Sequence, residues 1–403
     1  MIIPREIYQK IKPVIGSSEA IIITGMRRTG KTTLLRFISD HIRSENKIFL
    51  DLENPVNQKY FQEENYDKVA DNLNFLGLNA KQKSYVFLDE IQFVKNIPSV
   101  IKYLADHYKI KFFLSGSASF YLKNLFSESL AGRKYIFELF PLTFREFLAL
   151  KDIKRQWQAT RERGERSSRR MPANARDVTR PVFSELDRYY DEYLMFGGFP
   201  GVVQKESVEE KKMALEEIFS SYFQLEVRQL GDFRKIDSIR DLMFLLMQRT
   251  GSRLDIQKLS KELGVARETV YNYISFLENT YFIKLIRPFS RNRDIELRSQ
   301  PKFYLCDSGL VNQFARVDKG ALFENAVFSA LRLKGELNYY QRKSGVEIDF
   351  ILNKKSAYEV KTSPDQRDLA RLSELARELK LKDYSIISRN YFSNERIKYG
   401  FMI

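Results

Sequence analysis

Short apolar runs alternate with amphipathic stretches over the first 150 residues. Five runs have the length and composition of buried strands: AIIITG (20–25), KIFLDL (47–52), YVFLDE (85–90), KFFLSG (111–116) and KYIFELF (134–140). Helical patterns separate these runs, and this order is typical of a parallel sheet covered by helices. We therefore predict an α/β domain over residues 1–150.

The pattern changes after this domain. Residues 151–180 form a basic polar stretch with ten Lys/Arg and four Asp/Glu, which predicts a linker or loop, with nucleic-acid contact as the alternative. Residues 181–300 favour a helical and winged-helix domain, interrupted by FGGFPGVV at 196–203. Residues 301–403 return to mixed strand and helix patterns, so we expect a second α/β domain there.

A glycine-rich loop follows the first predicted strand. It has the form Gly-x-x-x-x-Gly-Lys-Thr and precedes the helical pattern TTLLRFISDHI. Its backbone N–H groups can face phosphate oxygens at the start of that helix. We expect Lys31 to reach the β- and γ-phosphates and the Thr32 hydroxyl to bind Mg²⁺. The predicted nucleotide-binding residues are Gly25, Met26, Arg27, Arg28, Thr29, Gly30, Lys31, Thr32 and Thr33.

Polar residues end two of the other predicted strands. Asp89 and Glu90 follow YVFL, where Asp89 can help to hold Mg²⁺ and Glu90 can polarise the attacking water. An ordinary acidic pair at a strand end is the alternative. Ser115 and Ser117 end KFFLSGSAS, where a polar side chain can sense the γ-phosphate.

The order of these motifs resembles a prokaryotic family of AAA+-type P-loop ATPases. The resemblance rests on GMRRTGKTTLL, FLDLEN, FLDEIQ, LSGSAS, LAGRKYIFEL and PLTFREFL. It implies ATP hydrolysis, with Ser117 as the sensor residue and Arg133 as an arginine finger. A finger supplied in trans requires a homo-oligomer. A structural ion pair is the alternative for Arg133, and no second sensor arginine is assigned.

The stretch 254–286 predicts a helix-turn-helix. Two helical patterns flank Gly264, and YFIKLI can start a wing. The second helix would present Arg267, Thr269 and Asn272 near its N-terminal half, where contacts to a DNA groove normally fall. A helical spacer or a protein-binding surface is the alternative.

Two predicted strands, VEIDFIL and AYEVKT, are joined by NKKS near the C-terminus. Because side chains alternate along a strand, Asp349 shares a face with Glu347, and Glu359 shares a face with Lys361. Glu324 lies on a preceding helical pattern. Carboxylates beside an ammonium suit metal-dependent phosphodiester cleavage with Mg²⁺ or Mn²⁺.

This pattern resembles the PD-(D/E)XK nuclease superfamily. The resemblance implies a restriction-endonuclease-like α/β domain with Glu324, Asp349, Glu359 and Lys361 as its site and with Asp349 and Glu359 as metal ligands. No proline precedes Asp349, which departs from the superfamily pattern. Two alternatives are a purely structural acidic hairpin and an inactive fold that is used for binding.

Composition narrows the class of protein. The 403 residues carry a net charge of +15, which favours an anionic partner such as DNA, although a basic soluble surface is the alternative. Cys306 is the single cysteine, so an internal disulfide and a cysteine-based zinc site are excluded. Without a long apolar run or a signal-peptide pattern in MIIPREIYQK, we expect a cytoplasmic protein with no membrane partner.

The leading hypothesis is therefore an ATP-hydrolysing AAA+-type ATPase coupled to a DNA-directed C-terminal module with nuclease activity. The alternative is a nucleotide-switched regulator that binds DNA or protein through an inactive nuclease-like fold. A third hypothesis is an ATPase whose partner is another protein.

Overall fold

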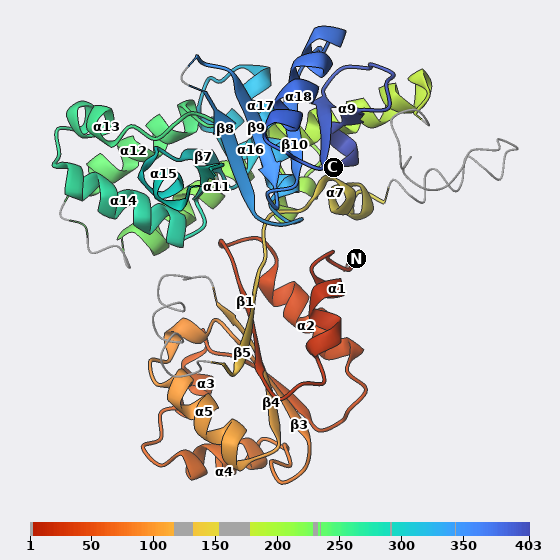
Figure 1. The fold of residues 1–403 in the computed structure, drawn as a ribbon. Helices are drawn as coiled ribbons and strands as arrows, with labels where there is room; N and C mark the ends of the chain where they lie inside the picture. Colours follow the sequence, from red (N-terminus) through yellow and green to blue (C-terminus); the bar gives the residue numbers. More distant parts are fainter. Residues whose placement is uncertain are drawn as a thin grey trace, which may run out of the picture. The chain divides into compact units, whose positions relative to one another are not determined.

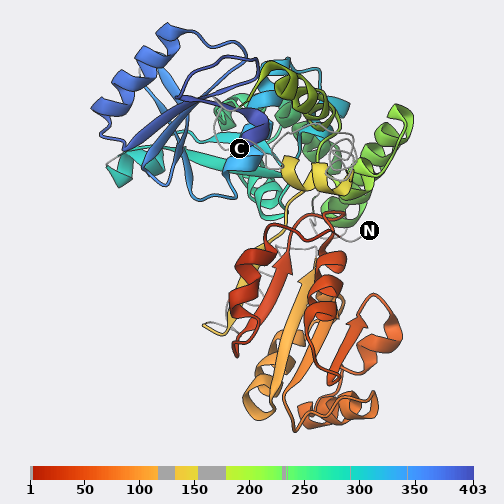
Figure 2. The same ribbon diagram turned by 90° about the vertical axis from the view of Figure 1, so that its right-hand side faces the viewer.

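The structure is a computed structural model that describes residues 3–116, 132–152, 178–228, 233, 235–290, 292–342 and 344–403. The chain divides into two compact units, shown from two sides in Figures 1 and 2. The first unit comprises Met1–Phe140 with Asn279–Tyr281, and the second comprises Pro141–Glu278 with Phe282–Ile403.

The first unit contains a parallel five-stranded sheet. Its strands are β1 (Ala20–Thr24), β2 (Lys47–Asp51), β3 (Ser84–Asp89), β4 (Ile110–Gly116) and β5 (Lys134–Glu138). Their order is β2-β3-β4-β1-β5, so β4 lies between the strand that precedes the glycine-rich loop and the strand that ends in Asp89. The parallel α/β sheet predicted for this region is confirmed.

Helices cover both faces of this sheet (Figure 1). They are α1 (Tyr8–Ile11), η1 (Lys12–Val14), α2 (Lys31–His41), α3 (Pro55–Lys59), α4 (Tyr66–Phe75), η2 (Ile91–Phe93) and α5 (Ile97–His107). Alternate side chains of β1 enter different cores, as the two-residue period of a strand requires. Ile21 and Ile23 pack with Leu35 of α2, whereas Ile22 packs with Ile101 of α5.

The second unit is rich in helices. They are α7 (Phe144–Leu150), α9 (Arg180–Phe196), α10 (Pro200–Val203), α11 (Val208–Tyr222), the π-helical turn η4 (Phe223–Arg228), α12 (Ile236–Gln248), α13 (Ile256–Leu263), α14 (Arg267–Asn279), α15 (Arg293–Arg298), α16 (Ser308–Phe314), α17 (Lys319–Leu331), α18 (Gln366–Glu378) and η5 (Gly400–Met402). Capping boxes at Thr143 and Ser207 fix the starts of α7 and α11. No helix in the described ranges is long and apolar enough to cross a membrane.

The two helices predicted around Gly264 are present as α13 and α14. Gly264 has a φ of 62°, a left-handed conformation that glycine adopts readily at a helix end. Arg249, just after α12, forms a two-pronged ion pair with Glu262 of α13, with N···O distances of 2.7 and 2.9 Å. This pair joins the ends of α12 and α13, the two helices that precede α14.

A seven-stranded sheet runs through the rest of the second unit. Its strands are β6 (Ile283–Pro288), β7 (Lys302–Leu305), β8 (Leu337–Gln341), β9 (Glu347–Leu352), β10 (Ser356–Lys361), β11 (Asp383–Ser388) and β12 (Ile397–Tyr399), in the order β12-β11-β10-β9-β8-β6-β7. The predicted hairpin is present as the antiparallel pair β9–β10. Because β6 pairs with both β7 and β8, the sheet continues across the boundary predicted at residue 300.

Candidate functional sites

The glycine-rich loop connects β1 to α2 and depends on glycine at two positions. A Cβ atom at Gly25 would lie 2.1 Å from the carbonyl oxygen of Leu139, so only glycine fits there. Gly30 has a φ of 93° and immediately precedes the first residue of α2. The loop therefore delivers the chain to a helix N-terminus, where unpaired N–H groups favour an anion.

Polar contacts fix the shape of this loop from within. The Thr29 hydroxyl donates to the carbonyl of Met26 at 2.9 Å. The buried Lys31 ammonium donates to the carbonyls of Gly25 and Met26 at 3.1 and 3.0 Å. Thr32 follows half-buried, while Arg28 and Thr33 are exposed. Lys31 thus lies over the loop, which is the place a phosphate-binding lysine needs.

Arg5 holds the loop from outside, and the sequence analysis missed it. Its guanidinium donates to the carbonyl of Thr29 at 2.8 Å and to the carbonyl of Phe140 at 2.7 Å. The Arg5 side chain is buried. Its partner Phe140 is the residue at which the chain leaves the first unit for the second. No local pattern marks Arg5, because both of its partners are distant in sequence.

The acidic strand end lies in the same sheet. Asp89 is buried, and one of its carboxylate oxygens accepts from the Ser115 hydroxyl and from the backbone N–H of Glu90. Ser115 lies on β4 beside Ile23 of β1, so β4 connects the acid to the strand that leads into the loop. Glu90 has a φ of 52°, and its carboxylate accepts from the Gln92 side chain. Ser117 lies outside the described residues.

Arg133 lies at the other end of the sheet. It precedes β5, and its carbonyl accepts from Ala20 at the start of β1, whereas the loop follows the end of β1. Its guanidinium pairs with Asp106 of α5, and this contact lowers the pKa of the Asp106 carboxyl. This geometry matches the ion-pair alternative, and a finger role would have to be exerted on another subunit.

The four nuclease-like residues predicted in the second unit lie in one region. One oxygen of the Asp349 carboxylate accepts from the backbone N–H of Val360 at 2.7 Å, across the β9–β10 hairpin. One oxygen of Glu359 accepts from Lys361 at 3.1 Å and from Arg371 of α18 at 2.5 Å. We call Glu324, Glu347, Asp349 and Glu359 the carboxylate cluster.

A second lysine, Lys302 of β7, stands among these carboxylates and was not predicted. Its ammonium nitrogen lies 3.5 Å from an oxygen of Glu347, 3.8 Å from one of Glu324 and 3.9 Å from one of Asp349. Tyr304, two residues on, donates its hydroxyl to the same Glu324 oxygen at 2.6 Å. In the sequence Lys302 begins an apolar strand and has no local mark of this role.

Burial shifts the protonation of the carboxylate cluster. Burial, together with the nearby Asp349 charge, raises the pKa of Glu324 to about 7. Burial and Asp349 likewise raise the pKa of Glu359 to about 7, and burial raises the pKa of Asp349. Burial acts to lower the pKa of Lys302, but Glu324, Asp349 and Glu347 raise it above its ordinary value. The Lys302 ammonium therefore remains charged at neutral pH.

The residues predicted to contact DNA lie on α14. Arg267 and Asn272 are exposed, and Thr269 is half-buried. Tyr271 between them is 60% exposed, which is unusual for a large aromatic side chain. Glu268 is also exposed, so the charge of Arg267 is balanced locally.

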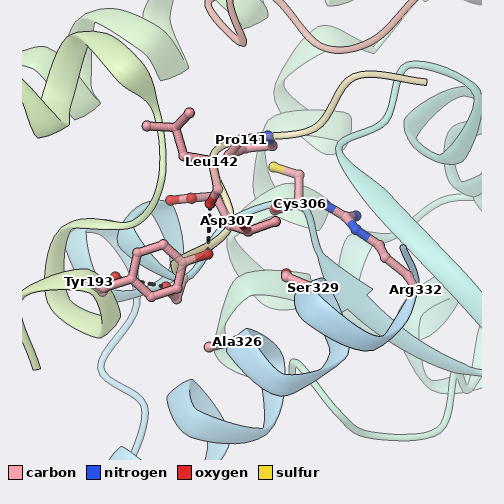
Figure 3. Close-up of a pocket in the computed structure, with 10 residues that line it drawn as sticks. Pro141, Leu142, Tyr193, Cys306, Asp307, Ala326, Ser329 and Arg332 are labelled. Carbon is pink, nitrogen blue, oxygen red and sulfur yellow. Dashed lines mark hydrogen bonds between the residues drawn. The ribbon is translucent and has the colours of Figure 1, made fainter. Parts of the chain in front are cut away.

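A small pocket in the second unit is built around Asp307 (Figure 3). Its carboxylate accepts from the backbone N–H groups of Gly198 and Gly309, both at 2.8 Å. Tyr193 in the same wall donates its hydroxyl to the carbonyl of Leu142 at 2.8 Å. Burial raises the pKa of Asp307 to about 6. These polar groups fix the Gly197-Gly198 turn and the start of α16.

The first unit combines a parallel α/β sheet with a glycine-rich loop between β1 and α2, and these features define a P-loop NTPase fold. Protein-family comparison agrees: residues 17–148 match an AAA domain. Residues 187–320 and 319–402 match two domains of unknown function, DUF8612 and DUF4143. The AAA match falls on the first unit and agrees with its P-loop fold.

Relatives align over most of the chain. An uncharacterized protein of Methanocaldococcus jannaschii is 28% identical, with 96% of this chain and 84% of the relative aligned. An uncharacterized protein of Haemophilus influenzae is 26% identical, over 83% of this chain and 79% of the relative.

Solved structures give weaker similarities. The Aeropyrum pernix Orc1 protein in complex with DNA aligns with a TM-score of 0.31 and 16% identity, over 83% of this chain and 95% of that chain. AMPPCP-bound DnaA from Aquifex aeolicus aligns with a TM-score of 0.30 and 15% identity, over 69% of this chain and 89% of that chain. At these TM-scores, neither similarity carries an argument about fold or function.

Proposed function

We propose that the first unit binds ATP with Mg²⁺ and hydrolyses it. The observation that carries this proposal is the loop between β1 and α2, where Gly25 and Gly30 are required by the backbone and Lys31 lies over the loop carbonyls. Such a loop wraps phosphates with its N–H groups while the lysine neutralises their charge.

The remaining residues of this site have distinct roles in the proposal. Thr32 and Asp89 would hold Mg²⁺, since a hydroxyl and a buried carboxylate are the hard oxygen donors that this ion prefers. When bound, the ion neutralises charge on the β- and γ-phosphates. Glu90 would orient the attacking water, and the Ser115 hydroxyl keeps Asp89 in place. Ser117 is the proposed γ-phosphate sensor.

We propose that the second unit is a binding module for DNA or protein that is coupled to ATP binding and hydrolysis. In this proposal it does not cleave nucleic acid. The observation that favours this candidate is charge compensation, because three cations of the protein, Lys302, Lys361 and Arg371, already pair with the four carboxylates of the cluster. Metal-dependent nuclease activity requires those carboxylates for its ions. For DNA, the proposed contact surface is α14, through Arg267, Thr269 and Asn272.

The ATPase proposal is tested by phosphate release from the purified full chain with ATP and Mg²⁺, with and without double-stranded DNA. Lys31→Ala removes the phosphate-binding ammonium, and Lys109→Ala, at an exposed lysine before β4, is the matched control. We expect hydrolysis to be lost only in Lys31→Ala. Equal hydrolysis by both variants would refute the proposal, and stimulation by DNA would identify DNA as the coupled partner.

A further inference from the structure

Lys302 occupies an unusual position for a lysine. The residue is 5% exposed, and a buried ammonium is costly unless opposite charges surround it. It has such partners, since carboxylate oxygens of Glu324, Glu347 and Asp349 all lie within 3.9 Å of its nitrogen. These carboxylates come from α17 and β9, while Lys302 comes from β7. The ammonium thus joins three elements of the second unit.

Some further contacts engage oxygens of the carboxylate cluster, whereas the second Glu359 oxygen is buried and has no hydrogen-bond partner among the described residues. The second Asp349 oxygen accepts from Val360, and the Glu324 oxygen that faces Lys302 accepts from Tyr304 as well. Glu359 lies on β10, the strand that pairs with the strand of Asp349, and it forms ion pairs with Lys361 and Arg371. The four carboxylates therefore face three cationic side chains of the protein itself.

This arrangement does not fit a divalent ion. Mg²⁺ and Mn²⁺ need oxygens at roughly 2 Å, and such an ion would have to enter the space that the Lys302 ammonium shares with its three carboxylates. Like charges in a buried site repel strongly. Within the part of the chain that the structure describes, no group of three or more His, Cys, Asp or Glu side chains is placed to hold a metal.

We propose that the Lys302 ammonium takes the place of a divalent cation in the carboxylate cluster, and that its removal lets Glu324, Glu347 and Asp349 close around a divalent cation, which they are not placed to hold as they stand. This inference deepens the non-cleaving role proposed for the second unit. Its test uses neither ATP nor DNA, so its failure is distinguishable from failure of the ATPase or of the binding function.

The experiment measures Mn²⁺ binding to the nucleotide-free full chain by the paramagnetic resonance signal of free Mn²⁺, together with thermal unfolding. Lys302→Met keeps the length of the side chain and removes its charge. We expect Lys302→Met to bind about one Mn²⁺ per chain more than the wild type binds. Mn²⁺ should also raise the unfolding midpoint of this variant, because a ligand of the folded state stabilises it. The double variant Lys302→Met/Asp349→Asn should lose both effects.

Two results would overturn the inference. One is a folded Lys302→Met variant that binds no more Mn²⁺ than the wild type. The other is a wild-type chain that binds Mn²⁺ without nucleotide and loses this ion in Asp349→Asn. The second comparison does not need Lys302→Met, so it decides the question even if that variant fails to fold.

Discussion

The two candidate sites carry similar side chains but use them in opposite ways. In the first unit, one lysine lies over backbone carbonyls of a loop at a helix N-terminus, and the nearby acid is oriented by a serine. In the second unit, Lys302 lies among three carboxylates. The first arrangement leaves positive character for an incoming anion, whereas the second satisfies its charges internally. Residue types in a motif therefore indicate chemistry only once their charge partners are known.

The largest expected effect on activity concerns the proposed water-orienting acid. Glu90→Gln should lower the rate of ATP hydrolysis by about 10²-fold or more, while ATP binding is retained. Phosphate release and nucleotide binding, measured on the same preparation, separate these effects. Glu64→Gln, at an exposed position of the same unit, is the matched control. Unchanged hydrolysis in Glu90→Gln would remove Glu90 from the mechanism.

The next effect concerns Lys302 and stability. Lys302→Met should lower the free energy of unfolding by about 3–5 kcal/mol at pH 8, because it leaves buried carboxylates without their cation. Lys284→Met on the neighbouring strand β6 is the control, since that lysine is exposed and its pair with Glu278 contributes about 1 kcal/mol or less. Urea unfolding measures both values. Similar small losses in the two variants would contradict the internal charge balance.

The raised pKa of Glu359 predicts a pH dependence. Its folded-state pKa of about 7 lies above its ordinary value of 4.5, so the folded chain binds more protons than the unfolded chain between these values. This residue's contribution to the free energy of unfolding therefore falls as the pH rises from about 4.5 to about 7. Glu359→Gln should flatten the plot of the free energy of unfolding against pH, by roughly 3 kcal/mol at most. The exposed Glu374→Gln is the control, and parallel curves for both variants would show that Glu359 does not titrate in this way.

A smaller effect is expected at Arg5. Arg5→Met removes the donors to Thr29 and Phe140 and should lower the free energy of unfolding by about 1–3 kcal/mol. Because the loop loses an external support, the KM for ATP should rise by roughly fivefold, which corresponds to about 1 kcal/mol. Steady-state kinetics beside the exposed control Arg43→Met tests this. A stable variant with an unchanged KM would show that the loop holds its shape without Arg5.

The smallest effect is expected on α14. If the helix contacts DNA phosphate, Arg267→Ala should weaken binding at low salt and reduce the slope of log affinity against log salt by about 1. The adjacent Glu268→Ala should strengthen binding, because it removes a negative charge from the same exposed turn. Fluorescence anisotropy at several salt concentrations measures both. DNA binding that is insensitive to either change would place the contact surface elsewhere.

Local patterns predicted a large part of this molecule. The five strands of the first unit, the loop, the helices around Gly264 and the β9–β10 hairpin all depend on near neighbours in sequence. Period-2 alternation also placed Asp349 with Glu347 and Glu359 with Lys361, and the Glu359–Lys361 contact is present at 3.1 Å.

Long-range partners were beyond such patterns. Arg5 reaches Phe140, 135 residues away. Lys302 meets carboxylates from two later elements, and the β6–β8 pairing extends one sheet across the predicted boundary at residue 300. These contacts depend on how elements pack, and no local period of a single sequence encodes that packing. The position of Arg133 at the opposite end of the sheet from the loop has the same origin.

The most direct test of the contrast between the two sites is Mn²⁺ binding by the wild-type chain with and without a non-hydrolysable ATP analogue. The account predicts about one Mn²⁺ per chain that binds only with the nucleotide and is lost in Lys31→Ala. Mn²⁺ that binds without nucleotide, is unaffected by Lys31→Ala and is lost in Asp349→Asn would contradict it. That result would make the carboxylate cluster, rather than the loop, the metal centre of the protein.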